Sequence, residues 1–176
     1  HYTARLNDQE LQDYLKEKNI KLLFYIHPKL QEFISTFYSE DSQIELYSFD
    51  SMPMNQLLMR CSMMITDYSS ACWDVYYQGK PILFYQFDLD QYNQTNGSYI
   101  DMETEIWGDR CMKQADLIRL IKEYAENGFQ EKEKYAAMRK DYFAYIDHNN
   151  CQRTYDYIKS QGVKTLAFGM SLSDLC

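Results

Sequence analysis

Hydroxyl and acidic side chains gather at residues 66–70 of the sequence (TDYSS). The apolar run before them, residues 63–65, predicts a buried strand, and residues 71–78 after them have helical spacing. A helix N-terminus leaves backbone N–H groups unpaired and carries a partial positive charge, so a turn in this position can bind an anion. The hydroxyls of Ser69 and Ser70 could donate further hydrogen bonds to a phosphate.

The same turn has a purely structural interpretation. Ser and Asp are the commonest N-cap residues, so these side chains could serve only to start a helix, and the local sequence leaves both interpretations open. For Asp67 we expect a role in shaping the turn, because a carboxylate beside a diphosphate repels it unless it is protonated, metal-bound or turned away. Ser69 and Ser70 are the better phosphate ligands, and Tyr68 could equally be a packed aromatic.

A histidine, His27, follows another apolar run and precedes Pro28 and Lys29. An imidazole titrates near neutral pH, so it can donate a hydrogen bond to a phosphate or assist a leaving group. A single histidine at the end of a strand is, however, more often a capping or core-edge group. The residues alone leave this choice open, and Lys29 adds a cation nearby.

The elements that must hold these side chains follow from the spacing of apolar residues. Apolar runs predict strands at residues 21–26, 44–47, 63–65 and 81–86. Helical spacing predicts helices at residues 8–18, 28–37, 54–61, 71–78, 117–127, 135–146 and 151–158, and the polar residues 93–98 predict an irregular segment. Strands separated by helices of this length imply right-handed crossovers. The predicted fold class is therefore α/β, a Rossmann-like three-layer domain with a parallel sheet.

Ligands of open parallel sheets bind outside the carboxyl ends of the strands. That rule selects three turns, at residues 27–29, 48–53 and 67–70. If their strands are neighbours, the turns lie along one edge and bring a histidine, a lysine, hydroxyls and N–H groups into one crevice. A nucleoside diphosphate would suit such a crevice.

Composition and charge exclude several classes of protein. With 176 residues, 45% of them hydrophobic, the chain suits one domain, and its net charge of -8 argues against a nucleic-acid surface, which needs clustered Lys and Arg. No apolar run approaches the ~20 residues of a membrane-spanning helix. The five cysteines lack paired short spacings, so we expect reduced thiols in a cytosol rather than a zinc site or a disulfide framework.

One acidic triplet, Asp88-Leu89-Asp90, looks like the metal-binding triplet of another class of sugar transferases. Such triplets are common by chance, and we interpret this one as surface polarity or a loop brace. We expect neither a metal nor a cofactor.

Three segments together resemble a known family. Residues 65–70 (ITDYSS), 80–85 (KPILFY) and 88–92 (DLDQY) are similar to the CDP-glycerol glycerophosphotransferase family of teichoic acid synthesis, and the resemblance extends over residues 21–162. It implies the C-terminal, nucleotide-binding half of a GT-B transferase. The implied activity is transfer of glycerol phosphate or a related polyol phosphate from a CDP-activated donor to a lipid-linked or polymer acceptor, with release of CMP.

The resemblance also implies roles for individual residues. In the family, the histidine of a His-Pro pair after such a strand is implicated in activity, so His27 is the predicted catalytic residue. The predicted donor and phosphate-binding residues are Asp67, Ser69, Ser70, Lys29 and Arg153. Arg153 matches the arginine that opens the family's last helix, where it either reaches a phosphate or ties the helix down, and we favour the tie.

Two departures from the family pattern indicate a divergent subgroup, whose acceptor or exact donor can differ. His148 stands where family members have a glycine after Asp147, and residues 106–109 (IWGD) stand where they have Pro-Gly.

We predict a donor-nucleotide-binding domain at residues 1–162 and a C-terminal tail at residues 163–176. Because the chain opens at His1 without a methionine, we expect a fragment. The resemblance is to the second half of a two-domain transferase, so it implies that an N-terminal half with the acceptor site and a second important histidine is missing. The expected partners are CDP-glycerol or a similar CDP-polyol and, through that half, a lipid-linked or polymer acceptor, but no nucleic acid. The expected location of the full-length protein is cytoplasmic, peripheral at the inner face of the cell membrane.

Two other functions stay open. A non-catalytic Rossmann-like interaction module could bind a partner through an aromatic surface, since the chain has 17 tyrosines and an apolar tail. A nucleotide-sugar glycosyltransferase domain would instead prefer UDP- or GDP-linked donors.

Overall fold

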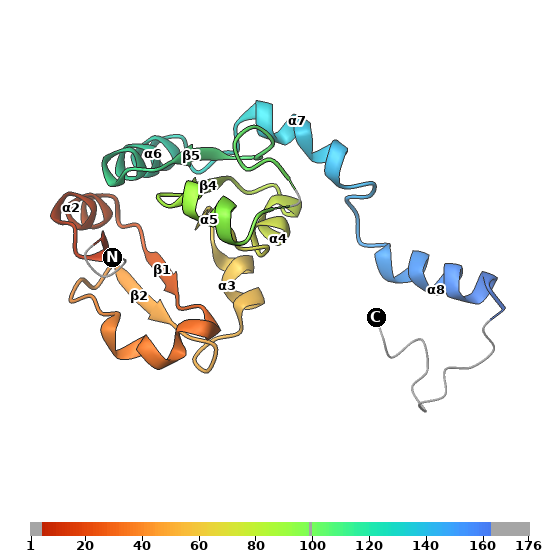
Figure 1. Ribbon diagram of the computed structural model, residues 1–176, viewed down its shortest axis with the longest axis horizontal. Helices are drawn as coiled ribbons and strands as arrows, with labels where there is room; N and C mark the ends of the chain where they lie inside the picture. The colour runs from red at the N-terminus through yellow and green to blue at the C-terminus, as the bar shows by residue number, and fades with distance from the viewer. Residues whose placement is uncertain (1–4, 99, 163–176) are drawn as a thin grey trace. The chain divides into compact units, whose positions relative to one another are not determined.

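In the computed structural model, which describes residues 5–98 and 100–162, the chain divides into two compact units, His1–Arg139 and Lys140–Cys176 (Figure 1). The strands lie in the first unit, and helix α8 (Asn150–Ser160) lies in the second. The tail predicted at residues 163–176 falls outside the described residues, and the domain boundary predicted at residue 162 stays a prediction.

The strands form two parallel sheets. In the first, β1 (Leu22–Tyr25) pairs with β2 (Ile44–Tyr47), and in the second the order is β3 (Met64–Thr66), β4 (Ile82–Tyr85) and β5 (Asp109–Cys111). Every pairing is parallel, which confirms the predicted α/β class. The four predicted strands are present, but within the described part of the chain no hydrogen-bonded ladder joins β1 to β3, so the expected single sheet is divided in two.

Strand β5 has no clear signal in the sequence. Two of its three residues, Asp109 and Arg110, are charged, so the segment shows no apolar run. It forms by extending the second sheet, where Arg110 lies in register with Phe84 of β4. Tertiary pairing therefore decides the conformation of this segment.

Helices connect the strands. In the first unit they are α2 (Gln9–Lys18), η1 (Pro28–Thr36), α3 (Met54–Arg60), α4 (Cys72–Tyr77), α5 (Leu89–Thr95) and α6 (Gln114–Glu126), and α7 (Glu133–Tyr142) follows them. Local signals explain the bounds of α2. Asp8 Oδ1 accepts from the N–H of Leu11 at its start, and Asn19 ends it in the left-handed conformation, with a φ of 51°.

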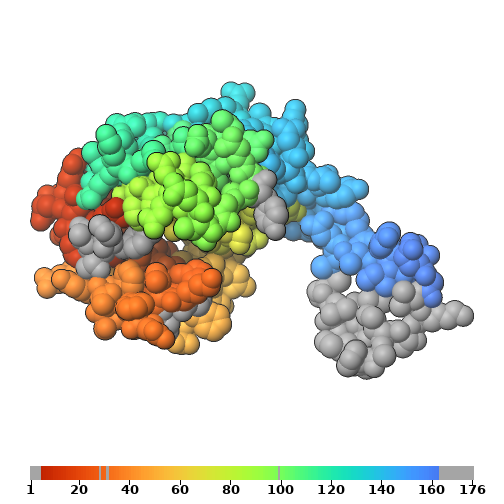
Figure 2. Space-filling model, viewed as in Figure 1, coloured from red at the N-terminus to blue at the C-terminus, as the bar shows by residue number. Residues whose placement is uncertain are grey.

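The segment after Pro28 is a 3-10 helix, η1, whereas its apolar stripe is typical of an α-helix. The stripe residues Leu30, Phe33 and Ile34 are exposed, and Figure 2 shows η1, in orange, at the outer surface of the first unit. Helices draw most of their stability from packing an apolar face. A stripe that faces solvent therefore does not enforce α-helical geometry here.

Two more helices differ from the expected pattern. Helix α5 occupies part of the segment predicted to be irregular, because buried Leu89 and the stacked ring of Tyr92 hold a polar sequence in helical form. The helix predicted to reach Ile146 ends as α7 at Tyr142. Ile146 is exposed, so no buried contact of that side chain extends the helix.

Strand β4 has all four side chains buried. Alternate residues of a strand point to opposite faces of its sheet. Leu83 and Tyr85 belong to the core that α2 and α6 cover, whereas Phe84 packs against Trp107, which also contacts Tyr76 of α4. Helices thus cover both faces of the sheet, as the predicted three-layer arrangement requires. In the core that α2 and α6 cover, the helical residues are Leu11, Leu15, Leu117, Ile118, Leu120 and Ile121.

A close backbone contact accompanies the buried Trp107. The ring of Trp107 lies 3.7 Å from that of Trp73, between ring centroids. The next residue, Gly108, passes directly beside β4, where an added Cβ would lie 2.2 Å from the carbonyl oxygen of Ile82. This approach of two backbones is possible only for glycine.

We expect Gly108→Ala to lower the free energy of unfolding by roughly 2–3 kcal/mol, because the added methyl forces the backbone away from β4. Urea denaturation measures this loss. The control is Gly128→Asn, at an open left-handed turn with a φ of 65°, which Asn tolerates and which has no neighbour within 4 Å. Equal losses of unfolding free energy in both variants would contradict the proposed steric clash between an added Cβ at residue 108 and the carbonyl oxygen of Ile82.

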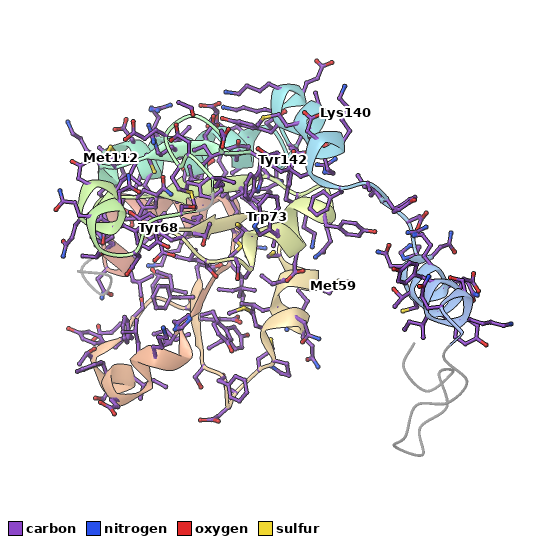
Figure 3. All side chains as sticks on the ribbon, turned by 45° about the vertical axis from the view of Figure 1, so that its right-hand side comes forward. Met59, Tyr68, Trp73, Met112, Lys140 and Tyr142 are labelled. Carbon is purple, nitrogen blue, oxygen red and sulfur yellow. The ribbon has the colours of Figure 1, made fainter. Side chains whose placement is uncertain are left out.

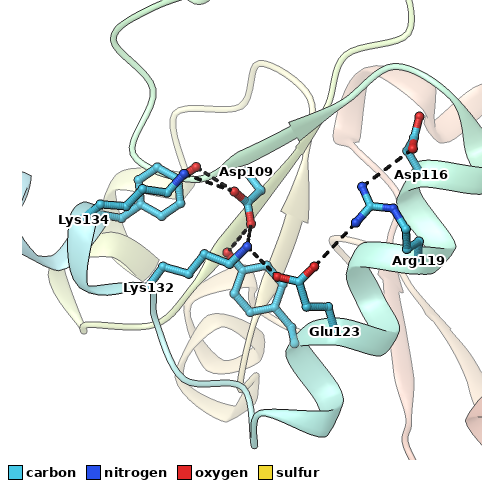
Figure 4. A network of polar contacts seen from close by, with 8 residues as sticks. Asp109, Asp116, Arg119, Glu123, Lys132 and Lys134 are labelled. Carbon is cyan, nitrogen blue, oxygen red and sulfur yellow. Dashed lines mark hydrogen bonds and ion pairs between the residues drawn. The ribbon is translucent and has the colours of Figure 1, made fainter.

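A half-buried carboxylate, Asp109, joins β5 to α6 and α7 (Figure 4). It accepts hydrogen bonds from Tyr135 Oη at 2.7 Å and Tyr124 Oη at 3.0 Å, and it pairs with Lys132 Nζ at 2.5 Å. Lys132 also pairs with Glu123 of α6, at 2.6 Å. Burial raises the pKa of Asp109, but the hydrogen bonds from Lys132 and the two tyrosines outweigh it and hold the pKa below its ordinary value of 3.8.

Because the folded-state pKa of Asp109 is depressed, its contribution to stability is complete at pH values above ~4 and is lost as the pH falls further. We therefore expect Asp109→Asn to lower the free energy of unfolding by about 2 kcal/mol at pH 7. The difference from the wild type should shrink towards pH 3, as measured by urea denaturation across this range. The exposed pair of Asp116 and Arg119 provides the control, Asp116→Asn, with a loss below ~0.5 kcal/mol. A pH-independent deficit would contradict the role assigned to the carboxylate.

Candidate functional site

The turn after β3 is shaped by its own side chains. Asp67 Oδ1 accepts from the N–H of Tyr68 at 2.6 Å, and Ser69 Oγ accepts from the N–H of Ala71 at 3.3 Å. The N-cap residue of α4 is Ala71, which has no side-chain cap. The serines are therefore not its N-cap residues, and the carboxylate folds back onto its own turn as expected for a shaping residue.

The turn offers hydrogen-bond donors to a ligand. Within residues 5–98 and 100–162, the backbone N–H groups of Ser69 and Ser70 have no hydrogen-bond partner, and the exposed hydroxyl of Ser70 has none either. Helix α4 has only six residues, so its dipole is small. These N–H and O–H groups, rather than a long helix, give the turn its capacity to bind an anion.

The histidine turn follows β1. His27 Nδ1 accepts from the N–H of Lys29 at 3.1 Å, so the neutral ring carries its proton on Nε2. Both side chains are exposed, and the Lys29 ammonium forms no ion pair with any described residue. This turn thus presents one hydrogen-bond donor and one positive charge to solvent.

The turn after β2 is closed on itself. The N–H of Ser48 donates to Ser51 Oγ at 2.7 Å, and that hydroxyl donates to the carbonyl oxygen of Ser48 at 3.0 Å. Its hydroxyls therefore support the loop.

The structure brings together only part of the predicted site. Asp67, Ser69 and Ser70 share one turn, whereas His27 and Lys29 follow a strand of the other sheet. The two sheets meet at a common core, against which residues of β1 and β3 both pack. Arg153 lies in the second unit, on α8.

Arg153 is occupied by its neighbours. Its guanidinium makes two hydrogen bonds to Asp147, of 3.1 and 2.7 Å, one to Asn150 of 2.6 Å, and lies 3.9 Å from the centroid of the Tyr145 ring. The hydrogen bonds from Arg153 lower the pKa of Asp147 to about 2. These contacts fit the favoured role of the arginine, which is to tie the start of α8 to the preceding turn.

Three residues that the sequence analysis did not assign to the site contact the turn after β3. Gln86 Nε2 donates to the carbonyl oxygen of Asp67 at 3.2 Å. Tyr68, labelled in Figure 3, donates through its Oη to Asp88 Oδ1 at 2.9 Å, and its ring stacks on that of Tyr92. Asp88 is thus a loop brace, one of the two roles expected for the acidic triplet. A polar residue directly after a fully buried strand was the available signal for Gln86.

Two kinds of feature are absent from the described residues. No group of three or more His, Cys, Asp or Glu side chains in residues 5–98 and 100–162 could hold a metal ion. Among the same residues, no helix is long and apolar enough to cross a membrane.

The family model described as CDP-glycerol:poly(glycerophosphate) glycerophosphotransferase matches residues 1–160. The chain belongs to this family. The match includes the turns after β1 and β3 as well as the whole of α8, and it confirms the family that the sequence resembles.

Curated relatives act in teichoic acid synthesis according to their names. The chain is 31% identical over 157 residues to the minor teichoic acid biosynthesis protein GgaB of Bacillus subtilis, covering 89% of the chain and 17% of GgaB. It is 29% identical over 160 residues to the teichoic acid poly(ribitol-phosphate) polymerase of Bacillus spizizenii, covering 90% of the chain and 25% of the polymerase. The chain therefore spans a quarter or less of the length of these relatives.

Among solved structures, a variant of the wall teichoic acid polymerase TagF is similar. The TM-score is 0.53 at 20% sequence identity, and the match covers 90% of the chain and 49% of the TagF chain. This likeness confirms the fold prediction, a mixed α/β domain with parallel strands like that in one half of a GT-B transferase.

We expect Arg153→Ala to raise the pKa of Asp147 from about 2 towards its ordinary value of 3.8, because the hydrogen bonds that stabilise the carboxylate are lost. An NMR titration of the carboxyl carbon measures this pKa. Gln152→Ala is the control, since Gln152 lies beside Arg153 on α8 but donates to Asp156. An unchanged Asp147 pKa in the arginine variant would show that this pair does not form in solution.

Proposed function

We propose that this chain is the donor-binding part of a transferase that moves glycerol phosphate or a related polyol phosphate from a CDP-activated donor to a lipid-linked or polymer acceptor. Its family supports this activity. The names of the relatives include both ribitol-phosphate and glycerol-phosphate enzymes, so either polyol fits. A structure of TagF soaked with CDPG supports the same donor class.

The observation that carries the proposal is the set of unpaired donors in the turn after β3. The N–H groups of Ser69 and Ser70 and the Ser70 hydroxyl can surround a phosphate oxygen without the help of a cation. In the proposed reaction an acceptor hydroxyl gives up its proton to a general base and attacks the phosphorus on the glycerol side of the diphosphate. The bond from that phosphorus to the bridging oxygen breaks, and CMP leaves with the bonding electrons. The turn stabilises the negative charge that develops on the CMP phosphate.

His27 is the proposed catalytic residue. Because the N–H of Lys29 occupies Nδ1, the Nε2–H on the opposite side of the ring is the group that can donate to an oxygen of the departing CMP. Lys29 is proposed to supply the positive charge that the serine turn lacks. Asp67 contributes by setting the shape of the turn, and a direct phosphate contact by Arg153 stays a prediction because its guanidinium already binds Asp147.

Further parts of the enzyme are proposed from the lengths of the relatives. The chain covers about half of the TagF chain, and we propose that a second half carries the acceptor site and a further histidine. We also propose that the full-length protein works at the cytoplasmic face of the cell membrane, as a peripheral protein that meets its lipid-linked acceptor there.

A binding experiment tests the donor role. We expect the isolated chain to bind CDP-glycerol weakly in an NMR titration, with shifts at Ser69, Ser70 and His27, and to release no CMP at enzyme-like rates in the presence of an acceptor. Ser70→Ala should weaken binding about fivefold, the effect of one lost hydrogen bond. The control is Ser62→Ala, an exposed serine before β3.

The remaining outcomes separate the alternatives. Stronger binding of UDP- or GDP-linked donors would replace the proposal with a nucleotide-sugar transferase. Absence of any nucleotide binding would favour a non-catalytic interaction module, for which exposed aromatics such as Phe33, Tyr38 and Phe49 would provide the surface. Rapid CMP release by the isolated chain would refute donor-only binding.

A further inference from the structure

We infer that Tyr68, Gln86, Asp88 and Tyr92 are positioning residues for the phosphate-binding turn, and we call these four residues the Tyr68 clasp. The inference rests on the proposed function, because it assigns the clasp to the same turn. None of the four is proposed to touch the donor. They hold the backbone of Ser69 and Ser70 so that their N–H groups converge on one phosphate.

The first part of the clasp is the fixation of the Tyr68 ring. Its hydroxyl donates to Asp88 Oδ1 at 2.9 Å, and its ring lies 3.6 Å from that of Tyr92, with an angle of 6° between the planes. Asp88 precedes α5 and accepts from the N–H of Tyr92 at 2.9 Å through its carbonyl oxygen. Asp88 and Tyr92 therefore both lie at the start of α5, and together they hold Tyr68 by its hydroxyl and by its ring.

The second part of the clasp is Gln86, which follows β4 and is fully buried. Its Nε2 donates to the carbonyl oxygen of Asp67 at 3.2 Å. Burying an amide costs free energy unless it is hydrogen-bonded, and this bond satisfies one N–H of the buried amide. Here that bond fixes the backbone immediately before Tyr68.

These contacts act at the right place in the chain. Gln86 holds the residue before Tyr68 and the ring contacts hold Tyr68 itself, so both residues that lead into Ser69 are fixed. A loop that is ordered before binding does not lose conformational entropy when the ligand arrives. The clasp should therefore change affinity for the phosphates and leave affinity for the nucleoside part unchanged.

The test compares two tyrosines that each donate to an aspartate. Tyr68→Phe keeps the ring stack but removes the bond to Asp88, and we expect it to weaken CDP-glycerol binding by the 176-residue chain about tenfold. Tyr135→Phe removes the bond to Asp109 of β5, which is separated from β3 by β4 in the sheet, and we expect it to lower Tm while changing affinity less than about twofold. NMR titration and thermal unfolding measure the two quantities.

Two substitutions of Asp88 test whether its acceptor oxygen is what matters. Asp88→Ala should weaken binding as Tyr68→Phe does, whereas Asp88→Asn keeps an acceptor oxygen and should bind within about threefold of the wild type. Cytidine, which has no phosphate, should bind all variants equally.

The outcomes distinguish the two proposals. If the wild-type chain binds CDP-glycerol and the Tyr68 and Asp88 variants bind it equally well, the positioning role is overturned and the proposed function stands. If cytidine binding falls in parallel with CDP-glycerol binding, the clasp is a general structural support, which also overturns the inference. If the wild-type chain binds no CDP-linked donor, both proposals fail together.

Discussion

Burial of strand β4 on both faces is the constraint on which the first unit depends. Because no side chain of β4 faces solvent, helices must cover both sides of the second sheet, and the neighbouring strands must supply its remaining hydrogen bonds. The backbone at Gly108 comes so close to the strand that only a hydrogen fits between them. The residue that follows this strand, Gln86, donates a hydrogen bond to the turn after β3. The position of that turn is thus fixed by the core.

Much of this fold follows from the sequence, since buried parallel strands are continuous apolar runs. Strands β1 to β4 follow such runs, and Asp8 and Asn19 mark the ends of α2 as capping rules predict. Strand β5 and helix α5 do not follow from any local pattern. Their residues are largely polar, and they take their conformations from pairing with β4 and from stacking on Tyr68. The 3-10 geometry of η1 does not follow from its sequence pattern either, because its apolar stripe is exposed and no packing enforces an α-helix.

The candidate site shows the same division. The types and order of Asp67, Ser69 and Ser70 identify a turn able to bind an anion, and family resemblance supplies the donor class. Spacing could not identify the residues that hold the turn, because Gln86 and Asp88 reach it from another part of the chain. Nor could it show that the arginine of α8 is already neutralised by an aspartate. In a chain with a net charge of -8, the turn offers a phosphate neutral donors rather than cations.

The hydrogen bond between Lys29 N–H and His27 Nδ1 limits what the imidazole can do. One ring nitrogen already shares its lone pair with the backbone, and the other holds the proton. A ring in this state can give a hydrogen bond but has no vacant lone pair with which to remove a proton. Deprotonation of an attacking hydroxyl by His27 would require the ring to turn over and break its bond to the backbone. While that bond persists, the general base of the proposed transfer must be a different group.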